Sequence, residues 1–190
     1  MQSKIATPEC MVRKAVPEDF DAILDLQKAN TPQNLTKEEY HQQGYIISAM
    51  NRDHLAAINQ NIGILVACVD NQLVGFVCLN STDMQPCPPV VAAMLKETTL
   101  QKIKQPLLFG ERICSYGPVC IDKTFRGRGI LRQLFSETKK YLHGQHDTGI
   151  AFIAVDNPHS LVAHVQGLGM HDVSVFMCAG KQYHLIAFSI

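Results

Sequence analysis

Apolar residues recur at two spacings along this chain of 190 residues, and glycine, proline and asparagine separate the segments in which they do so. Alternating or continuous apolar runs predict strands, and an apolar stripe at helical spacing predicts a helix. The expected strands are 10–16, 64–70, 73–80, 112–122, 149–156, 173–180 and 182–190. The expected helices are 17–30, 36–49, 52–60, 90–104, 130–142 and 157–168, of which 36–49 and 52–60 are the least regular. The pattern predicts about seven strands and four or five helices.

The strand expected at 112–122 is interrupted in its middle by Gly117 and Pro118. Glycine weakens a strand and proline cannot donate a hydrogen bond to its neighbour, so a bulge or a local split is predicted there. A helix over 130–142 and a strand over 149–156 that is apolar on both faces come next. A strand, a helix and a doubly buried strand are what a parallel crossover requires.

Two further features describe the organisation of the chain. The runs 64–70 and 73–80, separated by two residues, predict an antiparallel hairpin. The long connection at about 81–110 is proline-rich at first and helical afterwards, and a connection of that length is usually functional or a partner surface. The chain has no internal repeat and suits one hydrophobic core, so residues 1–190 are expected to form a single domain with an insertion at about 81–110.

The composition excludes several classes of protein. There are 17 basic and 17 acidic residues, so no extended basic face for nucleic acid or an anionic membrane is expected. Seven cysteines without a C-x-x-C pair indicate free thiols in a reducing compartment. No apolar run has the length of a signal peptide or a spanning helix, and the histidines form no H-x-H or H-x-x-x-H pair. We therefore expect a cytoplasmic protein with no metal site.

The segment FRGRGILRQLF, at 125–135, leads from the interrupted strand into the following helix. Free N–H groups at a helix start bind phosphate oxygens, and Gly127 and Gly129 let the backbone approach them closely. Arg126 and Arg128 add forked donors for further phosphate contacts. The third glycine of a dinucleotide fingerprint and the G-K-S or G-K-T of a Walker loop are missing. The segment predicts a phosphate-binding turn; the alternative is a surface turn with solvated arginines.

Arg126, Gly129 and Leu131 occupy the three defining places of the motif Q/R-x-x-G-x-G/A, and in this the chain resembles the GNAT superfamily of acyl-CoA-dependent N-acyltransferases. Leu131 departs from the small residue usual in that family. The resemblance extends over VRKAVPEDFDAILDL, LVGFVCL and NPHSLVAHVQGLGM, and so over nearly the whole chain. It implies an α/β (α+β) fold, a single GNAT-like domain with a mixed, mostly antiparallel sheet splayed between its fourth and fifth strands.

The resemblance also implies acetyl-CoA as co-substrate, with no metal. In the family, the pantetheine arm takes the place between the splayed strands and bonds to the main chain of the fourth. Asn157 and Ser160 are expected to cap the last helix, and they could also touch the end of the pantetheine. The residues implied for cofactor binding are Val119, Cys120, Ile121, Arg126, Gly127, Arg128, Gly129, Ile130, Leu131, Asn157 and Ser160.

The implied reaction is attack of an amine on the acyl-CoA carbonyl, with a backbone N–H near Val119 to Ile121 as the oxyanion donor. Many family members have a tyrosine seven residues after an asparagine to protonate the leaving sulfur. In this chain that place, counted from Asn157, is His164. An imidazole can donate a proton in the same way, so His164 is the expected catalytic acid. Its position on an apolar stripe fits a packing residue equally.

Relatives that use a glutamate base often carry it where this chain has Ser115. No carboxylate is available there, so a water-mediated relay is expected, with Tyr116 or Glu111 as candidates. Cys120 lies where a thioester would lie, which suggests a covalent acyl-enzyme. No partner base is identifiable for that thiol, and the chain uses cysteine freely as a small apolar residue.

The acceptor site is expected in the variable segments 30–60 and 81–110. The absence of an acidic cluster favours a small amine or a peptide N-terminus as acceptor. The missing glutamate and tyrosine and the leucine at 131 motivate a second hypothesis, a non-catalytic acyl-CoA-binding or partner-docking module. A homodimer through a sheet edge or the inserted helix is also left open. The residues expected to form an apolar acceptor wall are Leu35, Tyr40, Tyr45, Met84, Met94 and Leu95.

Overall fold

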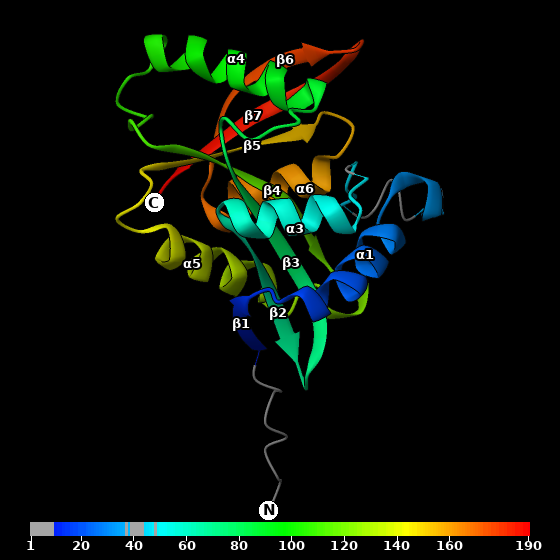
Figure 1. The fold of residues 1–190 in the computed structure, drawn as a ribbon. Helices are drawn as coiled ribbons and strands as arrows, with labels where there is room; N and C mark the ends of the chain where they lie inside the picture. Colours follow the sequence, from blue (N-terminus) through cyan, green and yellow to red (C-terminus); the bar gives the residue numbers. More distant parts are fainter. Residues whose placement is uncertain (1–9, 37, 39–43, 48) are drawn as a thin grey trace, which may run out of the picture.

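In the computed structural model, which describes residues 10–36, 38, 44–47 and 49–190, the chain forms one seven-stranded sheet in the order β1-β2-β3-β4-β5-β7-β6 (Figure 1). The strands are β1 (Cys10–Lys14), β2 (Gly63–Val69), β3 (Gln72–Ser81), β4 (Ile113–Ile121), β5 (Thr148–Ala154), β6 (His171–Cys178) and β7 (Lys181–Ser189). The helices among the described residues are α1 (Phe20–Ala29), α3 (Arg52–Asn61), α4 (Pro89–Lys104), α5 (Ile130–Leu142) and α6 (Pro158–Val162). The predicted number of strands and the mixed α/β class are confirmed.

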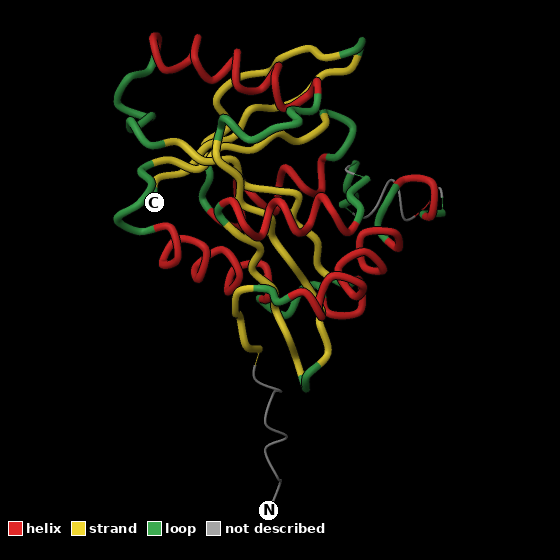
Figure 2. Tube along the Cα trace, in the orientation of Figure 1, coloured by secondary structure: helices red, strands yellow, loops and turns green. Residues whose placement is uncertain are grey.

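The sheet is antiparallel except between β4 and β5, which α5 connects as a crossover. β2 and β3 form the predicted hairpin, in which Asp70 and Asn71 make the turn with positive φ angles of 50° and 64°. Both residue types tolerate the left-handed conformation that a two-residue hairpin turn requires. Figure 2 shows the strands crossing the centre of the molecule with helices on both sides.

The strands β4 and β5 separate after a short paired stretch. Three residue pairs hold them together, from Ile113 opposite Thr148 to Ser115 opposite Ile150. Beyond Ser115, β4 stays paired only with β3, and the register between β3 and β4 shifts where Gly117 has a φ of +125°. That conformation favours glycine, so the flaw seen in the sequence becomes a bulge in the strand. The predicted splay between the fourth and fifth strands is confirmed.

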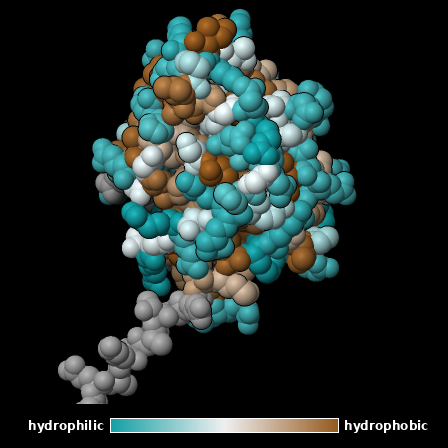
Figure 3. All heavy atoms as spheres, turned by 90° about the vertical axis from the view of Figure 1, so that its left-hand side faces the viewer, coloured by the Kyte–Doolittle hydropathy of each residue, from teal (hydrophilic) through white to brown (hydrophobic). Residues whose placement is uncertain are grey.

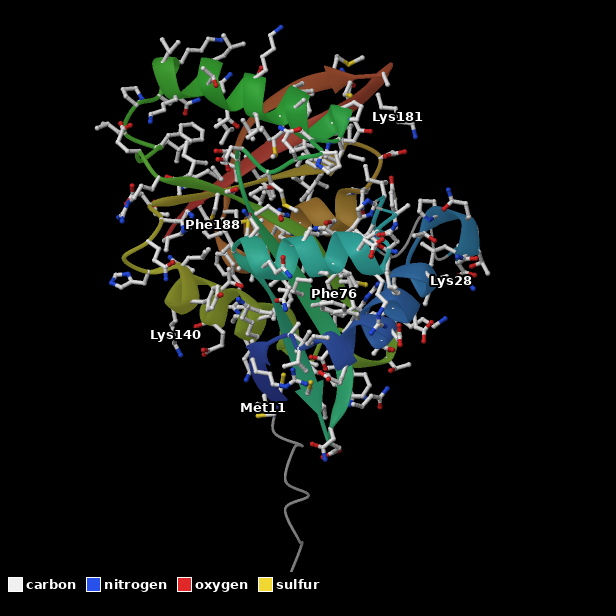
Figure 4. All side chains as sticks on the ribbon, in the orientation of Figure 1. Met11, Lys28, Phe76, Lys140, Lys181 and Phe188 are labelled. Atoms are coloured by element: carbon white, nitrogen blue, oxygen red, sulfur yellow. The ribbon has the colours of Figure 1, made fainter. Side chains whose placement is uncertain are left out.

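Helices cover both faces of the sheet. On one face, α1 and α3 pack on β2, β3 and β4, and α4 packs on β5, β6 and β7. Phe76 of β3 is fully buried beneath α3 (Figure 4). On the other face, α5 and α6 pack over a third cluster that includes Leu134, Tyr116 and Phe188. The splay therefore has α3 and α4 on one side and α5 and α6 on the other.

Some elements differ from the prediction. Residues 44–47 form no helix, and 37, 39–43 and 48 of the helix expected at 36–49 lie outside the described residues. The last helix is shorter than expected, because after α6 the chain continues as a π-helical turn at Ala163–Gly167. The hairpin between β6 and β7 turns on Ala179 and Gly180 rather than one residue later. Periodicity cannot detect such changes of winding or register.

No helix among the described residues is long and apolar enough to cross a membrane. Hydrophobic side chains do reach the surface near the C-terminal end of α4, where Leu100, Ile103 and Leu107 are exposed. In Figure 3, hydrophobic atoms gather at the top of the molecule, where α4 lies in Figure 1.

Candidate active site

Two cavities open onto the splay between β4 and β5. The first, of about 470 Å³, lies between α3 and α4. The second, of about 450 Å³, lies between the start of α5 and α6. Both are of the size that small-molecule and cofactor sites have. The residues that line both cavities are Tyr45, Ile46, Val119, Ser160 and His164. The cavities therefore meet at the splay, and a group bound in one can reach a group bound in the other.

The predicted phosphate-binding turn lies at the second cavity. Gly127 and Gly129 have φ angles of +74° and +81°, and Gly129 is the residue before the first turn of α5. A side chain would be strained at either position, although a Cβ atom added there would meet nothing within 4 Å. The N–H groups of Ile130 and Leu131, in the first turn, have no acceptor within the helix. The turn presents backbone donors and the positive end of the helix dipole to the cavity.

The two predicted arginines lie differently. Arg126 lines the second cavity, and its guanidinium donates to Ile121 O at 3.1 Å, Asn30 Oδ1 at 2.6 Å and Gly44 O at 3.3 Å. Arg128 is exposed, lies over the ring of Phe125 and does not line either cavity. Arg126 thus holds the segment at Gly44 against the end of β4, and direct phosphate contact by either side chain stays a prediction.

A further arginine was not predicted from the sequence. Arg132, one turn into α5, lines the second cavity and donates to Gly167 O at 2.9 Å. It ties α5 to the π-helical turn after α6. Its place three residues after Gly129, on the face that α5 presents to the turn, was the only sequence signal for it.

The main chain of β4 faces the splay at alternate residues. Asp122 N donates to Val74 O at 2.8 Å, so the backbone groups of Cys120, two residues earlier, point toward β3. Those of Val119 and Ile121 point the opposite way, toward the splay. Ile121 O accepts from Arg126, which leaves Val119 as the residue whose main chain faces both cavities.

Cys120 lines the second cavity, but its thiol packs against α1. It is buried beneath α1 and lies 3.9 Å from Leu26 O. Burial raises its pKa to about 12, so the thiol is protonated at neutral pH and is a poor nucleophile. This environment does not favour a covalent acyl-enzyme.

His164 lies in the π-helical turn and reaches the junction of the two cavities. Its Nδ1 is 2.7 Å from Ser160 O. A carbonyl oxygen can only accept, so Nδ1 carries the hydrogen and Nε2 of the neutral ring is a proton acceptor. The side chain is 8 % exposed, and burial lowers the pKa of the imidazole below its ordinary value. Nε2 has no hydrogen-bond partner among the described residues, so the neutral ring can accept a proton there before it donates one.

Tyr116 and Asn157 both line the first cavity, and each has a buried polar atom that lacks a hydrogen-bond partner among the described residues. These atoms are Tyr116 Oη and Asn157 Oδ1. The ring of Tyr116 packs edge-on against His164, at 6.1 Å between centroids. Burial raises the pKa of its phenol, which makes it a poor candidate for a base.

The expected capping role of Asn157 is wrong. Asn157 stands at the start of α6, but its side chain makes no cap; Nδ2 donates to Tyr45 O at 2.9 Å. The tie to Tyr45 draws the amide away from the helix, and this contact spans 112 residues of sequence. Ser160 lies inside α6 and supplies the carbonyl that holds His164.

The remaining predicted residues, Glu111 and the expected acceptor wall, lie only partly at the cavities. Glu111 is exposed, pairs with Lys102 at 3.0 Å and lines neither cavity, so it is not placed to act as a base. Of the expected acceptor wall, Tyr45, Met84 and Leu95 line the first cavity, whereas Met94 is fully buried and Leu35 lines neither cavity. Tyr40 is outside the described residues. No group of three or more side chains suited to hold a metal ion occurs in the described part of the chain.

Comparisons with known proteins agree with this geometry. The model of the acetyltransferase (GNAT) family matches residues 20–170. Among solved structures, an N-acetyltransferase from Staphylococcus aureus superposes with a TM-score of 0.62 at 18 % identity, over 95 % of this chain and 98 % of that one. The Salmonella typhimurium protein yncA, determined with its cofactor acetyl-CoA, gives 0.59 at 13 % identity, over 95 % and 93 %. A ribosomal-protein-alanine N-acetyltransferase from Brucella melitensis gives 0.60 at 16 % identity, over 95 % and 99 %.

A search of curated protein sequences found no match. The family match covers most of the chain, so the chain belongs to the GNAT acetyltransferase family. It is an acetyl-CoA-dependent acyltransferase.

Proposed function

We propose that the protein transfers an acetyl group from acetyl-CoA to a primary amine, of a small molecule or a peptide N-terminus, by direct attack within a ternary complex. The observation that carries the proposal is the meeting of two cavities at the splay between β4 and β5, with five lining residues in common. A cofactor and an acceptor that enter from opposite faces of the sheet would have their reactive ends in contact there. Such positioning alone supplies a large part of a catalytic effect.

The residues present fit acetyl-CoA, which supplies an activated acetyl thioester when bound. The turn at Gly127 and Gly129 would hold its diphosphate on backbone N–H groups, with open space where side chains would otherwise stand. Val119 would bond to the pantetheine arm through its main chain, in place of the missing strand neighbour. The edge of β4 left unpaired by the splay requires such a partner, because backbone groups in a closed site need hydrogen bonds.

His164 would carry the proton of the reaction at Nε2. The sequence predicts His164 as an acid. The hydrogen bond from Nδ1 to Ser160 O leaves Nε2 as a proton acceptor and so favours a role as base as well. Neutral His164 accepts the proton that the amine loses as its nitrogen bonds to the acetyl carbon. It then returns that proton to the sulfur as the C–S bond breaks, so one group serves as base and then as acid.

Initial-rate kinetics with acetyl-CoA and a panel of amines test the proposal. Intersecting double-reciprocal lines, with one CoA thiol released per amide formed, are expected for direct transfer. Parallel lines would instead indicate an acyl-enzyme. Tight binding of CoA by calorimetry, with no thiol release for any amine, would favour the non-catalytic binding module instead.

A further inference from the structure

We infer that the acceptor is a small primary monoamine with an apolar tail, whose tail fills the first cavity between α3 and α4. This inference rests on the proposed function and names the substrate class of the same site. It rests on the distribution of polar and apolar residues in that cavity, which is mainly apolar beside the helices and polar on the sheet.

Away from the splay the cavity is lined mainly by apolar residues, with His54 of α3 and Ser81 and Thr82 at the end of β3 as the polar members. The apolar part, the outer wall, is formed by side chains from both flanking helices and from the segments that precede them. α3 and the residues before it contribute Ile58 and Met50, the connection before α4 contributes Met84, and α4 contributes Val91 and Leu95 from successive turns. Residues four apart lie on one face of a helix, so Val91 and Leu95 present a continuous apolar strip to the cavity.

Uncompensated polar atoms lie on the sheet, at the base of the cavity beside the splay. Asn80 of β3 and Ser115 of β4 are cross-strand neighbours, and both line the cavity. Asn80 Oδ1 is buried without a partner in the described part of the structure, and Ser115 is 9 % exposed. An amine N–H donates to such acceptors. The base therefore suits one amino group, and the outer wall suits a hydrocarbon tail.

Charge selects against other acceptors. No Asp, Glu, Lys or Arg occurs among the described residues that line this cavity. A second ammonium or a carboxylate on the acceptor would be buried without a counter-charge, which costs more than a tail of equal length gains. Diamines, amino acids and basic peptides are therefore disfavoured.

The same apolar surroundings assist the chemistry. Desolvation disfavours the charged form of an amine, so entry into the cavity lowers the pKa of the ammonium and raises the fraction that can attack. The cavity thus favours deprotonation of the amine, which a carboxylate base would otherwise promote. Only amines whose tails bind in the cavity gain this effect.

The first experiment measures kcat/KM with acetyl-CoA for ethylamine, butylamine and hexylamine, and for diaminohexane and aminohexanoate. A rise of about fourfold per buried methylene is expected, with both charged-tail analogues at least about tenfold below hexylamine. A flat series, or faster turnover of a charged analogue or of a peptide N-terminus, would overturn the inference while leaving N-acetylation intact. No turnover of any amine would overturn the proposed function as well.

The same cavity could hold a long acyl chain instead, and the donor series decides this. With ethylamine as acceptor, acetyl-CoA is expected to outperform octanoyl-CoA. A preference for octanoyl-CoA would assign the cavity to the acyl group and overturn the inference.

A matched pair of variants tests the wall directly. Leu95→Asp places a carboxylate in the cavity, and Leu100→Asp makes the same change on the exposed side of the same helix, where Leu100 is 46 % exposed. Leu95→Asp is expected to raise the kcat/KM ratio of diaminohexane to hexylamine by at least about tenfold, as for a charge-assisted hydrogen bond. Leu100→Asp should leave that ratio unchanged. An unchanged ratio in both variants would overturn the inference, and loss of folding cannot imitate a reversal of preference.

Discussion

The two ends of the β4–β5 pair differ in how many of their polar side chains have partners within the protein. At the paired end, the partly exposed Arg112 binds Asp147 at 2.6 Å and Gly110 N donates to Thr148 Oγ1 at 2.8 Å, while Nδ1 of the neighbouring His146 has no partner among the described residues. At the splayed end, the hydroxyl of Tyr116 and Oδ1 of Asn157 have no partner among the described residues. Satisfied groups stabilise a fold, and unsatisfied ones cost free energy unless a ligand meets them. The paired end therefore holds the two half-sheets together, and the unpartnered atoms at the splayed end support the proposal that ligands bind there.

The largest effect is expected at the splayed end, from His164→Phe, which should lower kcat roughly 10²- to 10³-fold because proton transfer is lost. Burial lowers the pKa of His164 below 6.5, and the neutral ring is the active form. The kcat of the natural protein should therefore fall as pH drops through that lowered pKa, and the variant should lack this limb. His143→Phe, at an exposed histidine, is the control. An unchanged kcat would remove His164 from the mechanism.

Gly129→Val should raise the KM for acetyl-CoA roughly five- to thirtyfold, because a β-branched residue is strained by 1–2 kcal/mol or more at a φ of +81°. Gly180→Val introduces the same residue at a φ of +77°, in the hairpin far from the cavities. It should lower stability without changing the KM. Equal effects of the two variants on the KM for acetyl-CoA would show that the turn at Gly129 has no specific part in cofactor binding.

At the paired end, Thr148→Val should lower the free energy of unfolding by about 1–3 kcal/mol, since Gly110 N loses its acceptor in a partly buried position. The kcat should stay unchanged because Thr148 lines neither cavity. Thr148→Ser keeps the hydroxyl and should recover most of the loss. Denaturant titration measures both. A loss of activity without a loss of stability would contradict the division between the two ends.

The smallest effect, and one of opposite sign, is expected from Tyr116→Phe. Removing a buried hydroxyl that has no partner should leave the free energy of unfolding of the ligand-free protein unchanged or raise it by up to about 1 kcal/mol. Thermal unfolding in the absence of acetyl-CoA measures this. A clear decrease in stability would show that the hydroxyl is bonded in solution, and the contrast between the two ends would be lost.

Much of the candidate site could be located from the sequence. Gly127 and Gly129, the flaw at Gly117 and the position of His164 are local signals, and each lies at a cavity or at the splay. Their roles were less accessible. Nothing near Asn157 in the chain indicates that its amide binds Tyr45 O instead of capping a helix. The role of Arg126 could not be predicted either, because one of its hydrogen-bond partners, Asn30, lies 96 residues away in the sequence.

The sequence by itself determined the order of strands and helices, the break in β4 and the glycine turn, because hydrophobic spacing and backbone conformational preference act over a few residues. Only the tertiary structure decided which nitrogen of His164 carries the hydrogen, where the two cavities meet and how apolar the lining of the first cavity is. Those properties depend on contacts between residues far apart in the chain, and such contacts exist only once the sheet has folded and the helices have packed on its two faces.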